Sequence, residues 1–145
     1  MKKIILLVIF FIAVFVIIFF TNKKPVTSIT TPPTQTEQFK LISTNPNPLN
    51  ESTILPTQDI ELTFNKEVVR SEIKYKIDPE VLHKIEVING KNDSTGTNFR
   101  IVFTKPLELG SGITLFILSS THTEGDEKLD KEYIYHIKTV GYRGI

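Results

Sequence analysis

Residues 60–64 read Ile60-Glu61-Leu62-Thr63-Phe64, and this stretch decides the fold of the chain. Its large apolar side chains stand at every second position, with one acidic and one hydroxyl side chain between them. A β-strand sends successive side chains to opposite faces of its sheet. The alternation therefore predicts a strand with one apolar face and one polar face.

The same alternation recurs in five further segments, and an opening strand brings the predicted number to seven. The predicted strands are residues 39–42, 60–64, 73–77, 84–87, 99–103, 113–118 and 132–139. Both faces of segment 113–118 are apolar, which predicts a central strand. Runs of Pro, Gly, Asn and Asp predict the turns between strands, at residues 45–48, 55–56, 89–96, 105–107, 110–112 and 124–126. Several short strands at this spacing predict an all-β fold, a β-sandwich or a small barrel.

Helical signals are weak in this part of the chain. Residues 79–83 (Pro-Glu-Val-Leu-His) are the one helical candidate, and they could form at most a single turn.

The start of the chain has a different pattern, an unbroken apolar run from Ile4 to Phe20. As a helix this run would be roughly 26 Å long, against a hydrocarbon core of roughly 30 Å. Lysines flank it on both sides, and their long side chains can reach the two membrane surfaces. A cleaved signal peptide is the alternative, but its apolar region is usually about 7–15 residues and ends in small residues. We expect residues 1–21 to be an uncleaved transmembrane anchor.

Residues 22–38 are rich in Thr and Pro, and Val26 and Ile29 are their only large apolar residues. Such a segment cannot build a core, so it predicts an extended linker. The linker would carry a domain at residues 39–140, with residues 141–145 as a tail.

Composition excludes several classes of protein. The chain has no Cys, which excludes a disulfide scaffold, a thiolate zinc site and a Cys nucleophile. It has 17 basic and 16 acidic residues, and four of the lysines flank the apolar run. The remainder is net acidic without a basic run, so we expect no nucleic-acid partner.

The predicted domain resembles the bacterial Ig-like domain of the SbsA type, first described in S-layer proteins. The segments that carry the resemblance are Leu41–Pro46, Ile60–Val68, Phe99–Leu107, Leu107–Ile117 and Glu132–Thr139. The sequence departs from the family at Ile113, where a Tyr is frequent, and at Gly125–Leu129, where a Gly-Asn turn is typical. The resemblance implies an Ig-like β-sandwich outside the cytoplasm that acts as a spacer, stalk or adhesion module without catalysis. It also implies a cytoplasmic N-terminus.

Motifs for chemistry are missing. His83, His122 and His136 lack the i, i+2 or i, i+4 spacing of paired metal ligands. The sequence contains no G-x-S-x-G, no G-x-G-x-x-G and no P-loop. We therefore expect no catalytic, cofactor-binding or metal-binding residues, no cofactor and no small-molecule ligand.

Two alternatives concern binding. The acidic residues Glu124, Asp126, Glu127 and Asp130 could bind calcium, although they do not match the spacing of a calcium loop and Lys128 interrupts them. We expect a solvated hairpin tip here.

Aromatic and apolar side chains near the end of the chain raise the second alternative. Tyr133 and Tyr135 could stack on a sugar ring, but they share a face with Ile137 and are expected in the core. Phe116 and Leu118 lie on the other face of their strand and would form a partner surface if left uncovered.

The sequence thus predicts a single-pass membrane protein that displays an Ig-like β-sandwich outside the cell. Its contacts would be the membrane, through Ile4–Phe20, and a protein partner at the cell surface. A calcium-binding or glycan-binding module, secreted or anchored, is the alternative function.

Overall fold

The structure is a computed structural model that describes residues 37–142. The expected anchor at residues 1–21, nearly all of the expected linker and residues 143–145 lie outside the described residues. Within residues 37–142, no helix has both the length and the apolar character needed to cross a membrane.

The described residues form eight β-strands, joined by turns and by one 3-10 turn at Arg70–Glu72. The strands are β1 (Leu41–Asn45), β2 (Ser52–Ile54), β3 (Ile60–Val69), β4 (Tyr75–Asp78), β5 (His83–Asn92), β6 (Thr95–Phe103), β7 (Gly112–Ile117) and β8 (Tyr133–Thr139).

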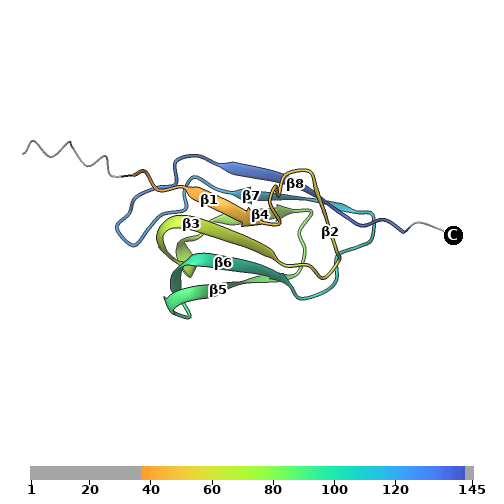
Figure 1. Ribbon diagram of the computed structural model, residues 1–145, viewed down its shortest axis with the longest axis horizontal. Helices are drawn as coiled ribbons and strands as arrows, with labels where there is room; N and C mark the ends of the chain where they lie inside the picture. Colours follow the sequence, from red (N-terminus) through yellow and green to blue (C-terminus); the bar gives the residue numbers. More distant parts are fainter. Residues whose placement is uncertain (1–36, 143–145) are drawn as a thin grey trace, which may run out of the picture. The chain divides into compact units, whose positions relative to one another are not determined.

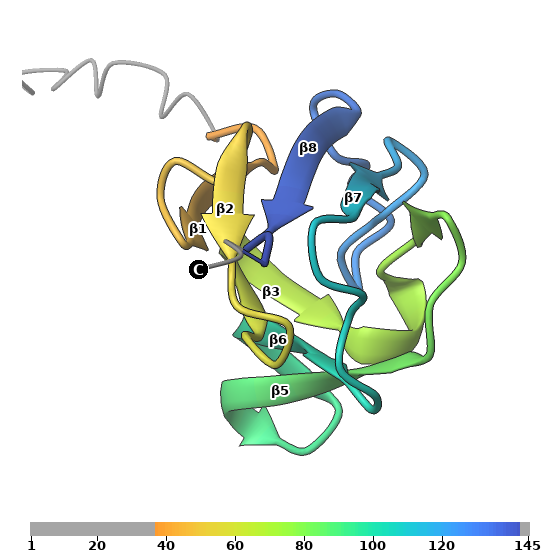
Figure 2. The ribbon, with the colours of Figure 1, turned by 90° about the vertical axis from the view of Figure 1, so that its right-hand side faces the viewer.

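The strands build two sheets of four strands each (Figure 1). The first sheet has the order β1-β3-β6-β5 and is antiparallel throughout. The second has the order β2-β8-β7-β4, in which β2 runs parallel to β8 and the other neighbours are antiparallel. The two sheets lie face to face (Figure 2), which confirms the prediction of an all-β sandwich.

The core lies between the sheets and consists of the alternating apolar residues. Ile60, Leu62 and Phe64 of β3 are at most 1% exposed, whereas Glu61 and Thr63 between them are half-buried. The ring of Phe64 contacts two further rings, with 5.4 Å between its centroid and that of Phe39 and 5.9 Å to that of Phe99. The period-two pattern therefore predicted the inward face of this strand.

The prediction of a central strand at residues 113–118 is confirmed, because β7 lies between β8 and β4. The turn predicted at residues 124–126 is also present. It lies in the connection from β7 to β8, between two residues that pair across it, His122 and Lys128.

Three predictions need correction, and the first is the number of strands. β2 was not predicted, because three residues between two proline-containing turns are too few to show a period. It forms because Ser52–Ile54 lies in parallel register with Ile137–Thr139 of β8.

The second correction concerns residues 89–96, predicted as a long polar turn. β5 and β6 continue through most of this segment, with irregular register after Val87. Only Asp93 and Ser94 lie between the strands. The side-chain oxygen of Asn92 accepts hydrogen bonds from the backbone N–H groups of Ser94 and Thr95. Gly90 permits the close approach, because a Cβ there would lie 2.1 Å from the Thr95 carbonyl oxygen.

The third correction concerns the helical candidate at residues 79–83. Residues 79–82 have no regular structure, and His83 begins β5. The segment connects β4 and β5, which are edge strands of different sheets. His83 takes an extended conformation because it pairs with Phe103 of β6.

Candidate interaction surfaces

The three histidines lie apart and each has a different neighbour. His83 packs edge-on against Tyr75, with ring centroids 5.4 Å apart. His136 is exposed on the outer face of β8, where its Nδ1 lies 3.2 Å from the hydroxyl of Thr114. Within residues 37–142, no group of three or more His, Cys, Asp or Glu side chains is placed to hold a metal ion.

His122, in the connection from β7 to β8, has an acidic neighbour. It is half-buried, and its Nε2 lies 3.1 Å from a carboxylate oxygen of Glu72. Lys74 lies 3.3 Å from the same oxygen. Hydrogen bonds from Ser71 and Lys74 hold the pKa of the Glu72 carboxyl below its usual range. Sequence spacing gave no signal for this cluster, because fifty residues separate His122 from Glu72.

The acidic segment Glu124–Asp130 folds back onto the first sheet instead of gathering its carboxylates. Glu127 accepts hydrogen bonds from Lys66 of β3, at 2.7 Å, and from the backbone N–H of Phe39, at 2.9 Å. These bonds, with that of Lys66 the stronger, hold the pKa of the Glu127 carboxyl below its usual range. Asp126 is almost fully exposed at the tip. The expectation of a solvated tip therefore fits Asp126 but is wrong for Glu127, which joins the connection to β3.

Asp130 and Tyr133 form a second link at the end of this segment. The Tyr133 hydroxyl donates a hydrogen bond of 2.9 Å to Asp130, and the backbone N–H of Asp130 donates to the Phe39 carbonyl oxygen. Burial, together with the nearby Asp130 carboxylate, raises the pKa of Tyr133 to about 12. Tyr133 and Tyr135 are half-buried and both pack against the core, as expected from their face.

A shallow groove of about 210 Å³ opens between β1, the β1–β2 connection and β8. Its lining includes Ile42, which is 53% exposed, the buried Leu49 and the half-buried Tyr135. Burial raises the pKa of the Tyr135 hydroxyl. Small-molecule pockets usually enclose about 300–1,000 Å³. This groove is smaller and mixed in polarity, so it can receive a side chain of a protein partner.

The outer face of the second sheet carries the apolar side chains that the sequence singled out. Phe116 is half-buried, and its cross-strand neighbours are Ile134 on one side and Lys76 on the other. The Lys76 ammonium lies 5.9 Å from the centre of the Phe116 ring, and Ile134 is 48% exposed. Side chains of the same sheet therefore cover Phe116 in part, whereas Ile134 remains exposed.

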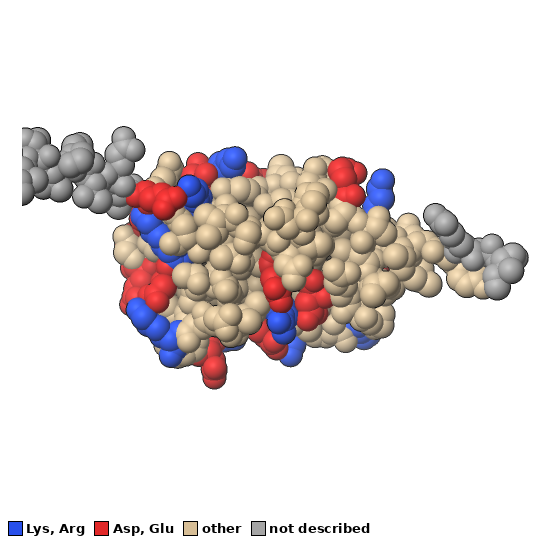
Figure 3. Space-filling model, viewed as in Figure 1, with Lys and Arg blue, Asp and Glu red and all other residues tan. Residues whose placement is uncertain are grey.

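Charges on the surface are mixed in sign. Figure 3 shows lysine and arginine side chains interspersed with acidic ones over the face in view. Several belong to pairs within or between strands, such as Arg100 with Glu61 and Lys91 with Glu67.

No protein-family model and no curated protein matches the chain. Among solved structures, the chain is similar to CopC from Methylosinus trichosporium OB3b, known from a crystal structure. The two share 11% sequence identity with a TM-score of 0.41, and the alignment covers 74% of this chain and 99% of that chain.

Proposed function

We propose that the chain is a membrane-anchored, non-catalytic Ig-like module that stands outside the cytoplasm and acts as a spacer or protein-binding domain. The observation that carries the proposal is the order of the strands. If β1, β3, β4, β5, β6, β7 and β8 are lettered A to G, the sheets become A-B-E-D and G-F-C. This is the arrangement of a seven-stranded Ig domain. β2 is then an additional strand beside G.

The contacts of two acidic side chains support a binding role without catalysis. Glu127 contacts Lys66 and Asp130 contacts Tyr133, so these carboxylates hold connections in place. Sheet edges and loop ends, which remain exposed, are the parts of a sandwich that bind other proteins. The resemblance to the SbsA-type domain agrees with this role and remains a prediction.

The apolar run Ile4–Phe20 supports the anchor and gives its test. We expect alkali extraction of membranes to leave the full chain in the pellet. Replacing Phe11 and Val14 by Lys should release it, since each lysine at the centre of a membrane helix costs about 2.5–3.5 kcal/mol. The control replaces Thr30 and Thr31 by Lys, which adds the same charge outside the run and should leave the chain in the pellet. A wild-type chain in the supernatant would exclude the anchor.

Intact cells provide the second arm of this experiment, which tests the orientation. Protease added outside should cut the Thr/Pro-rich residues 22–38 and release a fragment that contains the sandwich. A fragment that appears only after the cells are opened would place the sandwich in the cytoplasm and contradict the proposal.

A further inference from the structure

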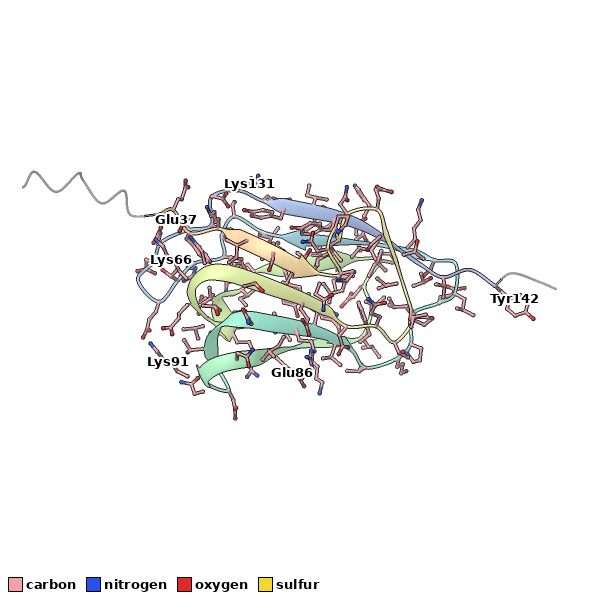
Figure 4. The ribbon with its side chains drawn as sticks, viewed as in Figure 1. Glu37, Lys66, Glu86, Lys91, Lys131 and Tyr142 are labelled. Carbon is pink, nitrogen blue, oxygen red and sulfur yellow. The ribbon has the colours of Figure 1, made fainter. Side chains whose placement is uncertain are left out.

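β5 forms one edge of the first sheet, and no strand lies on its outer side within residues 37–142. Its single strand neighbour within the described residues is β6 (Figure 1). It is ten residues long, one of the two longest strands of the sandwich. Glu86 and Lys91 extend from this edge strand (Figure 4). An open edge of this length can pair with another strand.

The pairing of β5 with β6 shows which backbone groups face the open side. The Thr104 N–H donates to the Leu82 carbonyl oxygen, so residue 82 and the even-numbered residues that follow bond to β6. In an antiparallel pair the alternate residues direct both N–H and C=O away from the partner strand. His83, Ile85 and Val87 therefore present their backbone donors and acceptors to the open edge.

The side chains alternate in the same register. Ile85 and Val87 point inward and pack against the core, yet both are only half-buried. Lys84 and Glu86 point outward, with 2.6 Å between the Lys84 Nζ and a Glu86 carboxylate oxygen. The open edge thus carries one positive and one negative side chain, placed symmetrically about Ile85.

This symmetry makes the edge complementary to itself. Two copies of β5 can pair antiparallel about a two-fold axis at Ile85, so that residue 83 lies opposite 87 and residue 85 opposite 85. The outward-directed backbone groups of both strands would then face one another. Lys84 of each copy would lie opposite Glu86 of the other, in two oppositely charged cross-strand pairs. An axis at His83 or Val87 does not bring these charges together.

The rest of β5 limits the pairing to its first half. The register with β6 is irregular between Val87 and Asn92, and β-bulges of this kind bend and twist a strand. A straight edge is therefore available only over His83–Val87. Pairing of two such edges uses both of them, so the assembly closes as a dimer.

We infer that β5 is a homodimerisation edge, at which two chains join their first sheets into one continuous sheet with Ile85 on the axis. The cores of the two copies become continuous at this edge, and the side chains of Ile85 and Val87 lose their remaining exposure to solvent. The inference deepens the protein-binding role proposed above by naming a second copy of this chain as the partner. It does not depend on the membrane anchor, which would only raise the local concentration of the two chains.

Crosslinking of the full chain through a single cysteine tests the inference, since the natural chain has no Cys. Ile85→Cys places the two Cα atoms about 5.5 Å apart across the axis, within the range for a disulfide. Mild oxidation in membranes should convert this variant to a covalent dimer, visible on a non-reducing gel. In Lys84→Cys the two cysteines are diagonal, about 8 Å apart, too far for a disulfide. Its yield should be several-fold lower.

Ile134→Cys is the matched control for random collision. It is also a change from Ile to Cys, but residue 134 lies on the outer face of the second sheet and its side chain is more exposed than that of Ile85. Collision between chains would crosslink this variant at least as well as Ile85→Cys. Equal yields, or no dimer from Ile85→Cys, would overturn the inference.

Charge exchange in the Ile85→Cys chain tests the register. Lys84→Glu alone, or Glu86→Lys alone, puts like charges opposite one another twice and should lower the crosslinking yield about fivefold. The two substitutions together exchange the charges and should restore the yield. A double variant as poor as the single ones would exclude the axis at Ile85. If alkali releases the chain but Ile85→Cys still crosslinks, the anchor fails and the pairing stands.

Discussion

Strands β3 and β5 belong to the same sheet, have the same length and show the same alternation in sequence, yet they are buried very differently. The inward residues of β3 are at most 1% exposed, whereas Ile85 and Val87 of β5 remain half-buried. β3 lies between β1 and β6, and β5 has a strand on one side only. The place of a strand in its sheet therefore decides how much of its apolar face is buried.

The ion-paired lysines of the two strands differ in the same way. Lys66 of β3 pairs with Glu127 in the β7–β8 connection, and the Lys66 side chain is 25% exposed. Lys91 of β5 pairs with Glu67, and its side chain is 71% exposed. The first pair joins segments that are far apart in the chain, whereas the second lies on the open surface, where water screens it.

The largest expected effect is in β3. Phe64→Ala should reduce the free energy of unfolding by about 3–5 kcal/mol, because it leaves a cavity among Phe39 and Phe99 in the centre of the core. Thermal or denaturant unfolding of the full chain in detergent micelles, followed by circular dichroism, measures the loss. A loss near zero would show that the inward face of β3 is wrongly assigned.

The equivalent change in β5 should have a smaller effect. Ile85→Ala should cost about 1–2 kcal/mol, less than for a fully buried Ile, because this side chain keeps part of its contact with water in the single chain. The same unfolding measurement applies, at a dilution at which the chain is monomeric. A loss as large as that of Phe64→Ala would mean that another segment covers the edge, and the contrast between the strands would disappear.

The smallest expected effect is the pH dependence that arises from the ion pair between Lys66 of β3 and Glu127. The pKa of Glu127 is lower in the folded chain than in the unfolded chain, so folding favours the deprotonated, charged carboxylate. This stabilisation is present above the unfolded pKa and is lost as the pH falls through the folded pKa. Stability should therefore decline below about pH 4.3, and Glu127→Gln should reduce that decline.

Glu124→Gln is the matched control for this measurement. Its carboxylate is exposed in the same connection and has no ion-pair partner within the described residues. The unfolding temperature of this variant should follow that of the wild-type chain between pH 3 and pH 6. Identical acid profiles for Glu127→Gln and the wild-type chain would show that the Lys66 pair does not stabilise the fold.

Most of the strands could be predicted because alternation is a local property of the chain. Ile60, Leu62 and Phe64 point inward wherever their strand lies, since successive residues of a strand face opposite sides. β2 could not be predicted, because three residues show no period and their partner lies more than eighty residues away in β8. The long polar turn was wrong for a related reason. Asn and Gly favour turns locally, but the register between β5 and β6 extends both strands through them.

The candidate surfaces were harder to predict than the strands. The face of Tyr133 and Tyr135 followed from alternation and is confirmed. The partners of Glu127 and His122 were missed, because Lys66 and Glu72 approach them only through the packing of separate elements.

The sequence by itself determined that this region is all-β, where seven of its strands lie and which side chains of β3 and β8 face inward. It also supplied the apolar run on which the proposed anchor rests. The tertiary structure alone decided the order of the strands in each sheet, and with it that β3 is enclosed while β5 is an edge. The physical reason is that a strand's own residues set the direction of its side chains, whereas hydrogen bonds to strands distant in the chain set its neighbours.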